Sequence, residues 1–201
     1  MYNLPQATHI NQPLYKKAVF EKFNLKTAER ERFDADISKM NLVAHVATNT
    51  VPALKIGDDI KDFYVLQVIL KRQDYNVQNI LLLHKLIPQN IVFALQYEKQ
   101  TQLAVFHTSL QKSVWMTTAE TAIQLQGLTI ADAWKHIVAD IGGLDASAET
   151  SIEKQIVDRE HREKLIRQIE TLEKRCRTEK QTRKKYELHQ QIIKLKEKLN
   201  I

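Results

Sequence analysis

The stretch Phe63-Tyr64-Val65-Leu66-Gln67-Val68-Ile69-Leu70 decides the fold of this 201-residue chain. It is apolar at almost every position and rich in β-branched and aromatic residues, a composition typical of a strand that is buried on both faces. We therefore expect this segment to be central in a β-sheet against which helices pack.

The residues before this strand follow other patterns. Residues 1–13 carry two prolines and no clear period, which indicates an irregular segment. Apolar residues at helical spacing predict one helix from Leu14 and a second helix over residues 27–37. The change of period over residues 38–48 then favours a strand.

The residues after this strand predict a second series of helices and strands. A helix is expected over residues 75–86, and strands are expected over residues 91–97, 102–107 and 114–117. The sequence Thr129-Ile130-Ala131-Asp132 resembles a capping box that opens a further helix, which ends at Gly142-Gly143. Residues 1–141 are therefore expected to form an α/β (α+β) domain with a mixed β-sheet packed by helices.

The composition changes after a small, polar linker at residues 142–150. Residues 151–201 contain neither Gly nor Pro, and two sets of apolar residues follow the 4-3-4 spacing of a coiled-coil seam. The seam residues, through which the chain could form oligomers, are Leu165, Ile169, Leu172, Cys176, Leu188, Ile192, Leu195 and Leu199. The 12 residues from Cys176 to Leu188 break the heptad register. We favour one long helix whose seam shifts face, with a helical hairpin as the alternative.

The positive charge of the chain is confined to this tail. Residues 1–150 contain 15 basic and 15 acidic side chains, whereas residues 151–201 contain 15 basic and 9 acidic ones. The densest basic cluster, a candidate for contact with DNA or RNA phosphates, is Arg175, Arg177, Lys180, Arg183, Lys184 and Lys185. The alternative is a solvated helix face with pairs such as Glu163–Arg167. Both interpretations stay open at the level of the sequence.

Several classes of protein are disfavoured by the sequence. A single cysteine permits no intrachain disulfide, and no secretion signal or bilayer-length apolar run is present, so we expect a cytoplasmic protein without a membrane partner. Neither a phosphate-binding glycine loop nor a nucleophile elbow occurs, and the seven histidines are dispersed. We therefore expect neither a cofactor nor a metal site.

One catalytic alternative depends on the predicted order of elements. The order helix, strand, acidic loop, strand, helix, strand resembles the core of restriction endonucleases, in which carboxylates and a lysine hold Mg²⁺ and position water. The corresponding candidates are Asp59 or Asp62 together with Gln67 and Lys71. Gln67 stands where a carboxylate is needed, and Lys71 is four residues away instead of two, so the site would be degenerate.

The tail also carries a family resemblance. The run LEKRCRTEKQTRKKYEL at residues 172–188 resembles the closing signature of the prokaryotic domain-of-unknown-function family 4391. Earlier segments agree, among them Lys16-Lys17, the strand Val65–Lys71 and Ile87-Pro88. Members of this family often carry Glu in the strand that here contains Gln67. Their genes often lie beside DNA methyltransferase and helicase genes of restriction or phage-defence type, so the resemblance implies an accessory subunit in DNA-directed defence.

These observations favour a non-enzymatic accessory protein. We expect its α/β domain to dock a protein partner and its basic tail to form homo-oligomers, to contact nucleic acid, or both. The alternatives are a Mg²⁺-dependent nuclease with a degenerate site and a structural coiled-coil adaptor.

Overall fold

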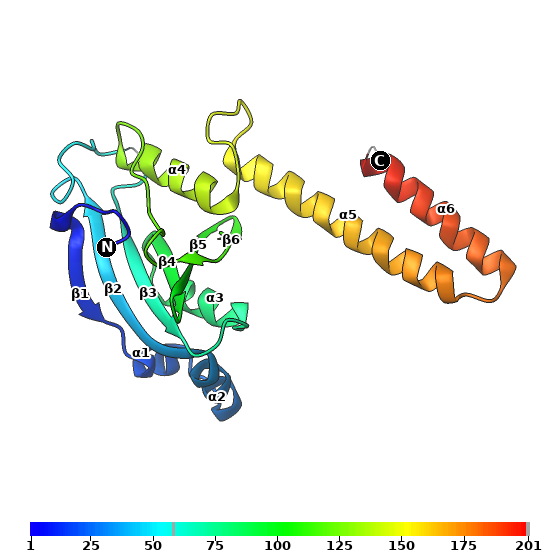
Figure 1. Cartoon of the computed structure of the whole chain (residues 1–201), viewed down its shortest axis with the longest axis horizontal. Coiled ribbons are helices and arrows are strands. Elements are labelled where there is room, and N and C mark those ends of the chain that lie inside the picture. The colour runs from blue at the N-terminus through cyan, green and yellow to red at the C-terminus, as the bar shows by residue number, and fades with distance from the viewer. Residues whose placement is uncertain (58, 200–201) are drawn as a thin grey trace. The chain divides into compact units, whose positions relative to one another are not determined.

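The computed structural model describes residues 1–57 and 59–199, and the described chain divides into two compact units, Met1–Ile152 and Glu153–Ile201. The first unit is built on a seven-stranded mixed sheet (Figure 1). Its strands are β1 (His9–Pro13), β2 (Ile37–Ala47), β3 (Asp62–Leu70), β4 (Ile91–Tyr97), β5 (Gln100–His107), β6 (Ser109–Lys112) and β7 (Met116–Thr117). Its helices are α1 (Lys16–Lys22), α2 (Thr27–Asp36), α3 (Val77–Leu86) and α4 (Ile130–Gly142), with a 3-10 turn at Gln6–Thr8.

The strand expected to be central is central. The strands follow one another in chain order from β1 to β6, and β7 pairs with β5. β3 and β4 are parallel, with Gln67 opposite Ala94, whereas the other pairs are antiparallel. Parallel neighbours need a crossover connection, and α3 supplies it between β3 and β4.

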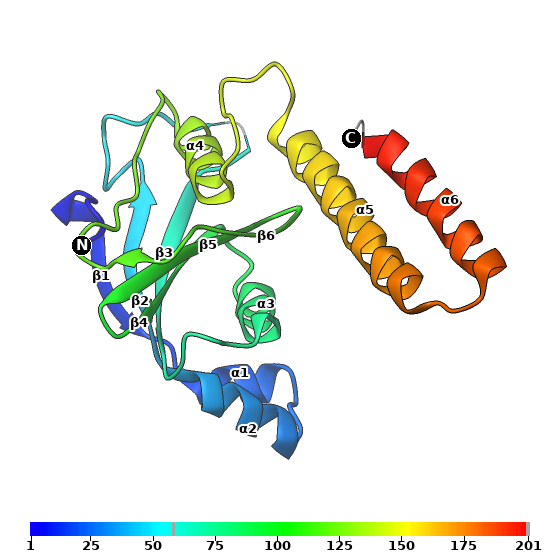
Figure 2. The ribbon, with the colours of Figure 1, turned by 45° about the vertical axis from the view of Figure 1, so that its right-hand side comes forward.

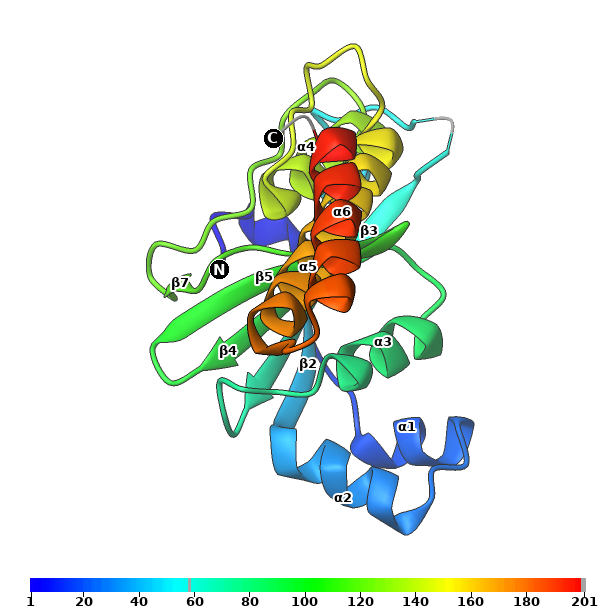
Figure 3. The ribbon, with the colours of Figure 1, turned by 90° about the vertical axis from the view of Figure 1, so that its right-hand side faces the viewer.

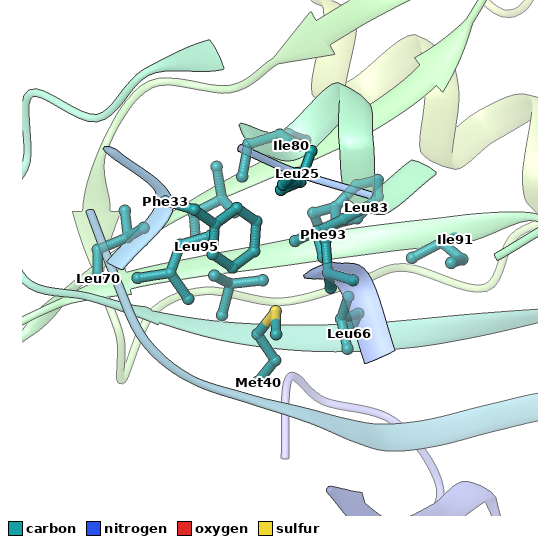
Figure 4. Close-up of a cluster of buried hydrophobic side chains, with 14 residues drawn as sticks. Leu25, Phe33, Met40, Leu66, Leu70, Ile80, Leu83, Ile91, Phe93 and Leu95 are labelled. Carbon is teal, nitrogen blue, oxygen red and sulfur yellow. The ribbon is translucent and has the colours of Figure 1, made fainter. Parts of the chain in front are cut away.

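Helices α1, α2 and α3 cover one face of this sheet. Their apolar side chains meet those of the central strands in a continuous core (Figure 4). Phe33 from α2 and Phe93 from β4 are both completely buried within it. The other labelled members of this core are Leu25, Met40, Leu66, Leu70, Ile80, Leu83, Ile91 and Leu95.

Helix α4 packs against the opposite face of the sheet. The ring of Trp134 lies 5.4 Å from the ring of Phe63, measured between centroids. The expected capping box is confirmed, because the Thr129 hydroxyl accepts from the Asp132 N–H and the Asp132 carboxylate accepts from the Thr129 N–H, both at 3.0 Å. The helix ends at Gly143, whose φ of 62° is left-handed, a conformation that favours glycine.

Two expectations for the first unit are corrected. The segment before residue 14 is not irregular throughout, because β1 pairs antiparallel with β2 at the edge of the sheet. An edge strand tolerates Pro13, since one side of its backbone has no neighbour to bond. Strand β6 was not anticipated. It follows β5 through a tight turn at Thr108, whose φ is 61°, a conformation that leaves little sequence signal in a residue other than Gly or Asn.

The second unit is a helical hairpin, so the expectation of a single long helix is wrong. Helices α5 (Ile152–Thr178) and α6 (Thr182–Leu199) run antiparallel, side by side in Figures 1 and 2 and with α6 in front of α5 in Figure 3. The connection at residues 179–181 is closed by the Glu179 carboxylate, which accepts from the N–H of Gln181 at 2.9 Å. The break in the heptad register thus marks a reversal of the chain, which allows the two seams to face each other.

Candidate functional site

The hairpin gathers the predicted nucleic-acid-binding side chains around its closed end. We call this end the basic tip and define it as residues 175–185, which comprise the last turn of α5, the connection and the first turn of α6. Its six cationic side chains, all exposed, are Arg175, Arg177, Lys180, Arg183, Lys184 and Lys185. Reversal of the chain therefore brings together cations that would spread along the axis of a single helix.

The charge of the basic tip is nearly unopposed. Glu179 is its only carboxylate, and this group already accepts from the backbone of Gln181. Arg183 pairs at 3.3 Å with Glu187, just outside the tip, while its own side chain stays 92% exposed. The tip thus holds an excess of five positive charges out of the six that the whole chain carries.

The position of these charges in α6 opposes the stability of the helix. The N-terminal end of a helix carries partial positive charge and favours acidic side chains, which are absent from the first turn of α6. Arg183, Lys184 and Lys185 stand there instead. Residues that break a local rule of helix stability are expected at functional positions.

The predicted oligomer seams are engaged within the chain. Leu165 and Ile169 of α5 pack with Ile192 and Leu199 of α6 in one buried cluster. Leu172, Cys176 and Leu195 are partly buried against it, and Leu188 is half-buried. An oligomer formed through these same residues would require α5 and α6 to separate.

An open groove of about 1080 Å³ follows the two helices beside this seam. Leu172 and Leu195 line its apolar part. Its rim carries both acidic and basic side chains, including Glu163, Lys164 and Lys198. Unlike the basic tip, the groove therefore carries two carboxylates, Glu160 and Glu163, among its cations.

The candidates for a nuclease site do not converge. Asp62 begins β3 and its carboxylate lies 2.9 Å from Nε2 of His45. Gln67 is five residues farther along the same strand and points to the opposite face, because side chains alternate along a strand. Asp59 is exposed before β3, and Lys71 is exposed after it. No group of three or more acidic, histidine or cysteine side chains suited to a metal ion occurs among the described residues.

Gln67 instead lines a polar hollow of about 650 Å³. Its amide donates to the carboxamide oxygen of Gln96 at 2.8 Å and approaches the hydroxyl of Tyr2 at 3.4 Å. Burial raises the pKa of Tyr2, and the hydrogen bond with Gln67 acts against that rise. No carboxylate lines the hollow among the described residues, and its polar lining includes Asn3, Thr118 and Thr121 beside Gln67 and Gln96.

Sequence reasoning missed the partners of Gln67. Gln96 joins it through the parallel register of β3 and β4, in which Ile69 lies opposite Gln96. Tyr2 reaches the sheet because Tyr2 and Asn3 both adopt left-handed φ values, 49° and 58°. Neither residue carries a motif, and only the polar interruption of an apolar strand at Gln67 could have pointed to this place.

The comparisons with known proteins identify a family without a described activity. The sequence model of the family described as Domain of unknown function (DUF4391) matches residues 2–199. No curated protein and no solved structure matches the chain. Among the described helices, none is both long enough and apolar enough to cross a membrane.

Proposed function

Because the chain belongs to the DUF4391 family of domains of unknown function, we propose a function from its own geometry: it binds nucleic acid through the basic tip. In this proposal the protein is a non-enzymatic accessory component of a DNA-directed system of restriction or phage-defence type. The defence setting rests on the family resemblance, whereas the binding activity rests on the hairpin.

One observation carries the proposal. The turn between α5 and α6 places six exposed cations around a single carboxylate that is already hydrogen-bonded. Like charges held this close repel one another, and a polyanion relieves that repulsion. Phosphodiester chains also release condensed counterions when cations bind them, so binding at the tip is expected to depend steeply on salt.

The two units have separate roles in this proposal. The hairpin presents the tip, and its internal coiled-coil-like seam keeps α5 and α6 together. The sheet unit docks a protein partner of the same system. The uneven distribution of charge supports this division, since residues 1–150 are balanced in charge and the hairpin carries the excess.

The experiment compares two triple variants of the full chain that lose the same charge. The first removes three tip cations by Arg183→Gln, Lys184→Gln and Lys185→Gln. The matched control removes three exposed cations that lie farther along the hairpin, by Lys164→Gln, Lys194→Gln and Lys198→Gln. Binding of labelled DNA and RNA is followed by fluorescence anisotropy, and far-UV circular dichroism checks that both variants keep the hairpin.

The proposal expects the tip variant to lose most of its affinity while the control stays near the parent chain. Equal losses in the two variants would show that net charge alone attracts the polyanion. A parent chain that binds neither DNA nor RNA would overturn the proposal.

A further inference from the structure

One exposed aromatic side chain directly follows the basic tip in the sequence. Tyr186 follows Lys185 in α6, and 65% of its surface is exposed. Its side chain makes no hydrogen bond or ring contact with another described residue. Single exposed aromatic residues are common on protein surfaces. Tyr186 differs from Tyr15 because it directly follows three consecutive cations, Arg183, Lys184 and Lys185, at the closed end of the hairpin.

Residues next to Tyr186 supply cationic side chains for a binding site. Arg183 stands three residues before Tyr186 in the same helix, and side chains at this spacing lie on the same side. Its guanidinium is almost fully exposed. Lys185 precedes Tyr186 directly, and its backbone carbonyl lies 3.7 Å from the Cys176 sulfur, which fixes this turn of α6 against α5. The Tyr186 ring and the Arg183 cation therefore lie on the same side of this anchored turn, and Lys185 adds a second cation on the adjoining side.

An aromatic ring beside cations favours unpaired nucleic acid over a duplex. In a duplex the base faces are covered by their neighbours, so a side chain on the outside of a helical tip meets mainly phosphates. In an unpaired strand the base faces are free, and proteins bind such strands with aromatic platforms beside a positively charged track. We propose that the basic tip prefers unpaired nucleic acid, with the Tyr186 ring stacked on a base and the flanking cations holding the phosphates. This inference rests on the proposed function and names the partner of the same site.

The test uses the full chain and four labelled ligands of equal length: single-stranded DNA, single-stranded RNA, duplex DNA and a strand of abasic sites. The variants are Tyr186→Ala, which removes the ring, and Tyr186→Phe, which keeps it. Tyr15→Ala serves as the control, since Tyr15 is 71% exposed and lies in the sheet unit. All four proteins keep the same net charge.

The inference expects Tyr186→Ala to weaken binding of the single strands by about 5- to 150-fold, the range for one stacked base. Duplex and abasic binding should change little, and Tyr186→Phe and Tyr15→Ala should behave like the parent. A preference for DNA or for RNA would identify the natural strand.

Two results overturn the inference and leave the proposed function intact: an unchanged affinity of Tyr186→Ala for single strands, and an equal loss for single-stranded, duplex and abasic ligands. If the parent chain binds none of the four ligands, the proposed function and this inference both fail.

Discussion

The Lys196 ammonium lies 2.9 Å from the Glu173 carboxylate, which joins α6 to α5 across the hairpin. Side chains lean toward the N-terminus of their own helix, so in an antiparallel pair these two lean toward each other. The hydrogen bond and charge of Lys196 hold the pKa of Glu173 below its usual value of 4.5. The contact links the fold of the hairpin to pH.

The first prediction concerns that link. A carboxyl whose pKa is lowered by folding stabilises the folded state above its unfolded pKa, and this contribution is lost as pH falls through the folded pKa. Glu173→Gln should therefore lower the melting temperature of the hairpin at neutral pH, and the difference should shrink as the pH falls below 4.5 and through the lowered pKa of Glu173. Far-UV circular dichroism follows the helices of both units, whereas the fluorescence of Trp115 and Trp134 follows the sheet unit alone, so a change seen only by circular dichroism reports the hairpin. Glu170→Gln, which removes a carboxylate that has no ion pair among the described residues, should not reproduce this pH-dependent difference.

The second prediction compares neighbouring residues of α6. Ile192 is 5% exposed in the seam, and Ile193 is 36% exposed beside it. Ile192→Ala should lower the free energy of unfolding of the hairpin by about 2–4 kcal/mol, because it removes buried methyl groups and leaves a cavity. Ile193→Ala should cost less than about 1 kcal/mol. Equal effects in urea titrations followed by circular dichroism would contradict the described seam.

A third prediction concerns Asp36, a completely buried carboxylate at the end of α2. It accepts from Nε of Arg72, and at 2.7 Å from both the backbone N–H of Asn76 and the side-chain amide of Asn79. Asp36→Ala leaves these donors unpaired and should cost about 3–5 kcal/mol, measured by tryptophan fluorescence in denaturant. Asp34→Ala breaks only a half-buried surface pair with Lys16 and should cost no more than about 1 kcal/mol. A similar cost for both changes would show that Asp36 does not organise this junction.

The fourth prediction is a rescue. A Cβ added at Gly57 would lie 2.5 Å from the Cβ of Ala131 in α4, which is too close for two carbon atoms that are not bonded to each other. Gly57→Ala should therefore destabilise the sheet unit by about 1–3 kcal/mol. Ala131→Gly removes the shortest of these contacts, leaving the backbone N of residue 131 at 3.1 Å, at a cost of about 1 kcal/mol for glycine in a helix. The double variant should be more stable than Gly57→Ala alone, and simple additivity of the two losses would count against the contact.

The sequence was informative where local pattern and packing agree. The nearly continuous apolar run of β3 predicted a central strand, and the Thr129–Asp132 box predicted the start of α4. Both the strand and the helix start are determined by residues that are close together in the sequence. Strands β1 and β6 were not predicted, because edge strands are polar and short. In addition, no glycine marks the turn at Thr108 that leads into β6.

The residues of the candidate site could be predicted from the sequence, but their arrangement around a turn could not. The cations of the basic tip could be recognised from their density alone. Whether these cations meet around a turn depends on how the chain accommodates the break in the heptad register. The two possibilities are one long helix whose seam shifts face and a helical hairpin. The connection at residues 179–181 contains neither Gly nor Pro, so the sequence favoured a continuous helix. Packing of Leu165 and Ile169 against Ile192 and Leu199 favours the hairpin instead, and that contact is not local in sequence.

The salt dependence of nucleic-acid affinity tests the central claim most directly. The affinities of the parent chain and of the Arg183→Gln, Lys184→Gln, Lys185→Gln variant are measured for the same labelled strand over a series of salt concentrations. Each phosphate contact contributes about −0.7 to −0.9 to the slope of log affinity against log salt. A site at the basic tip predicts that the slope becomes shallower by about 2–3 in the variant. An unchanged slope would contradict the claim that the tip is where nucleic acid binds.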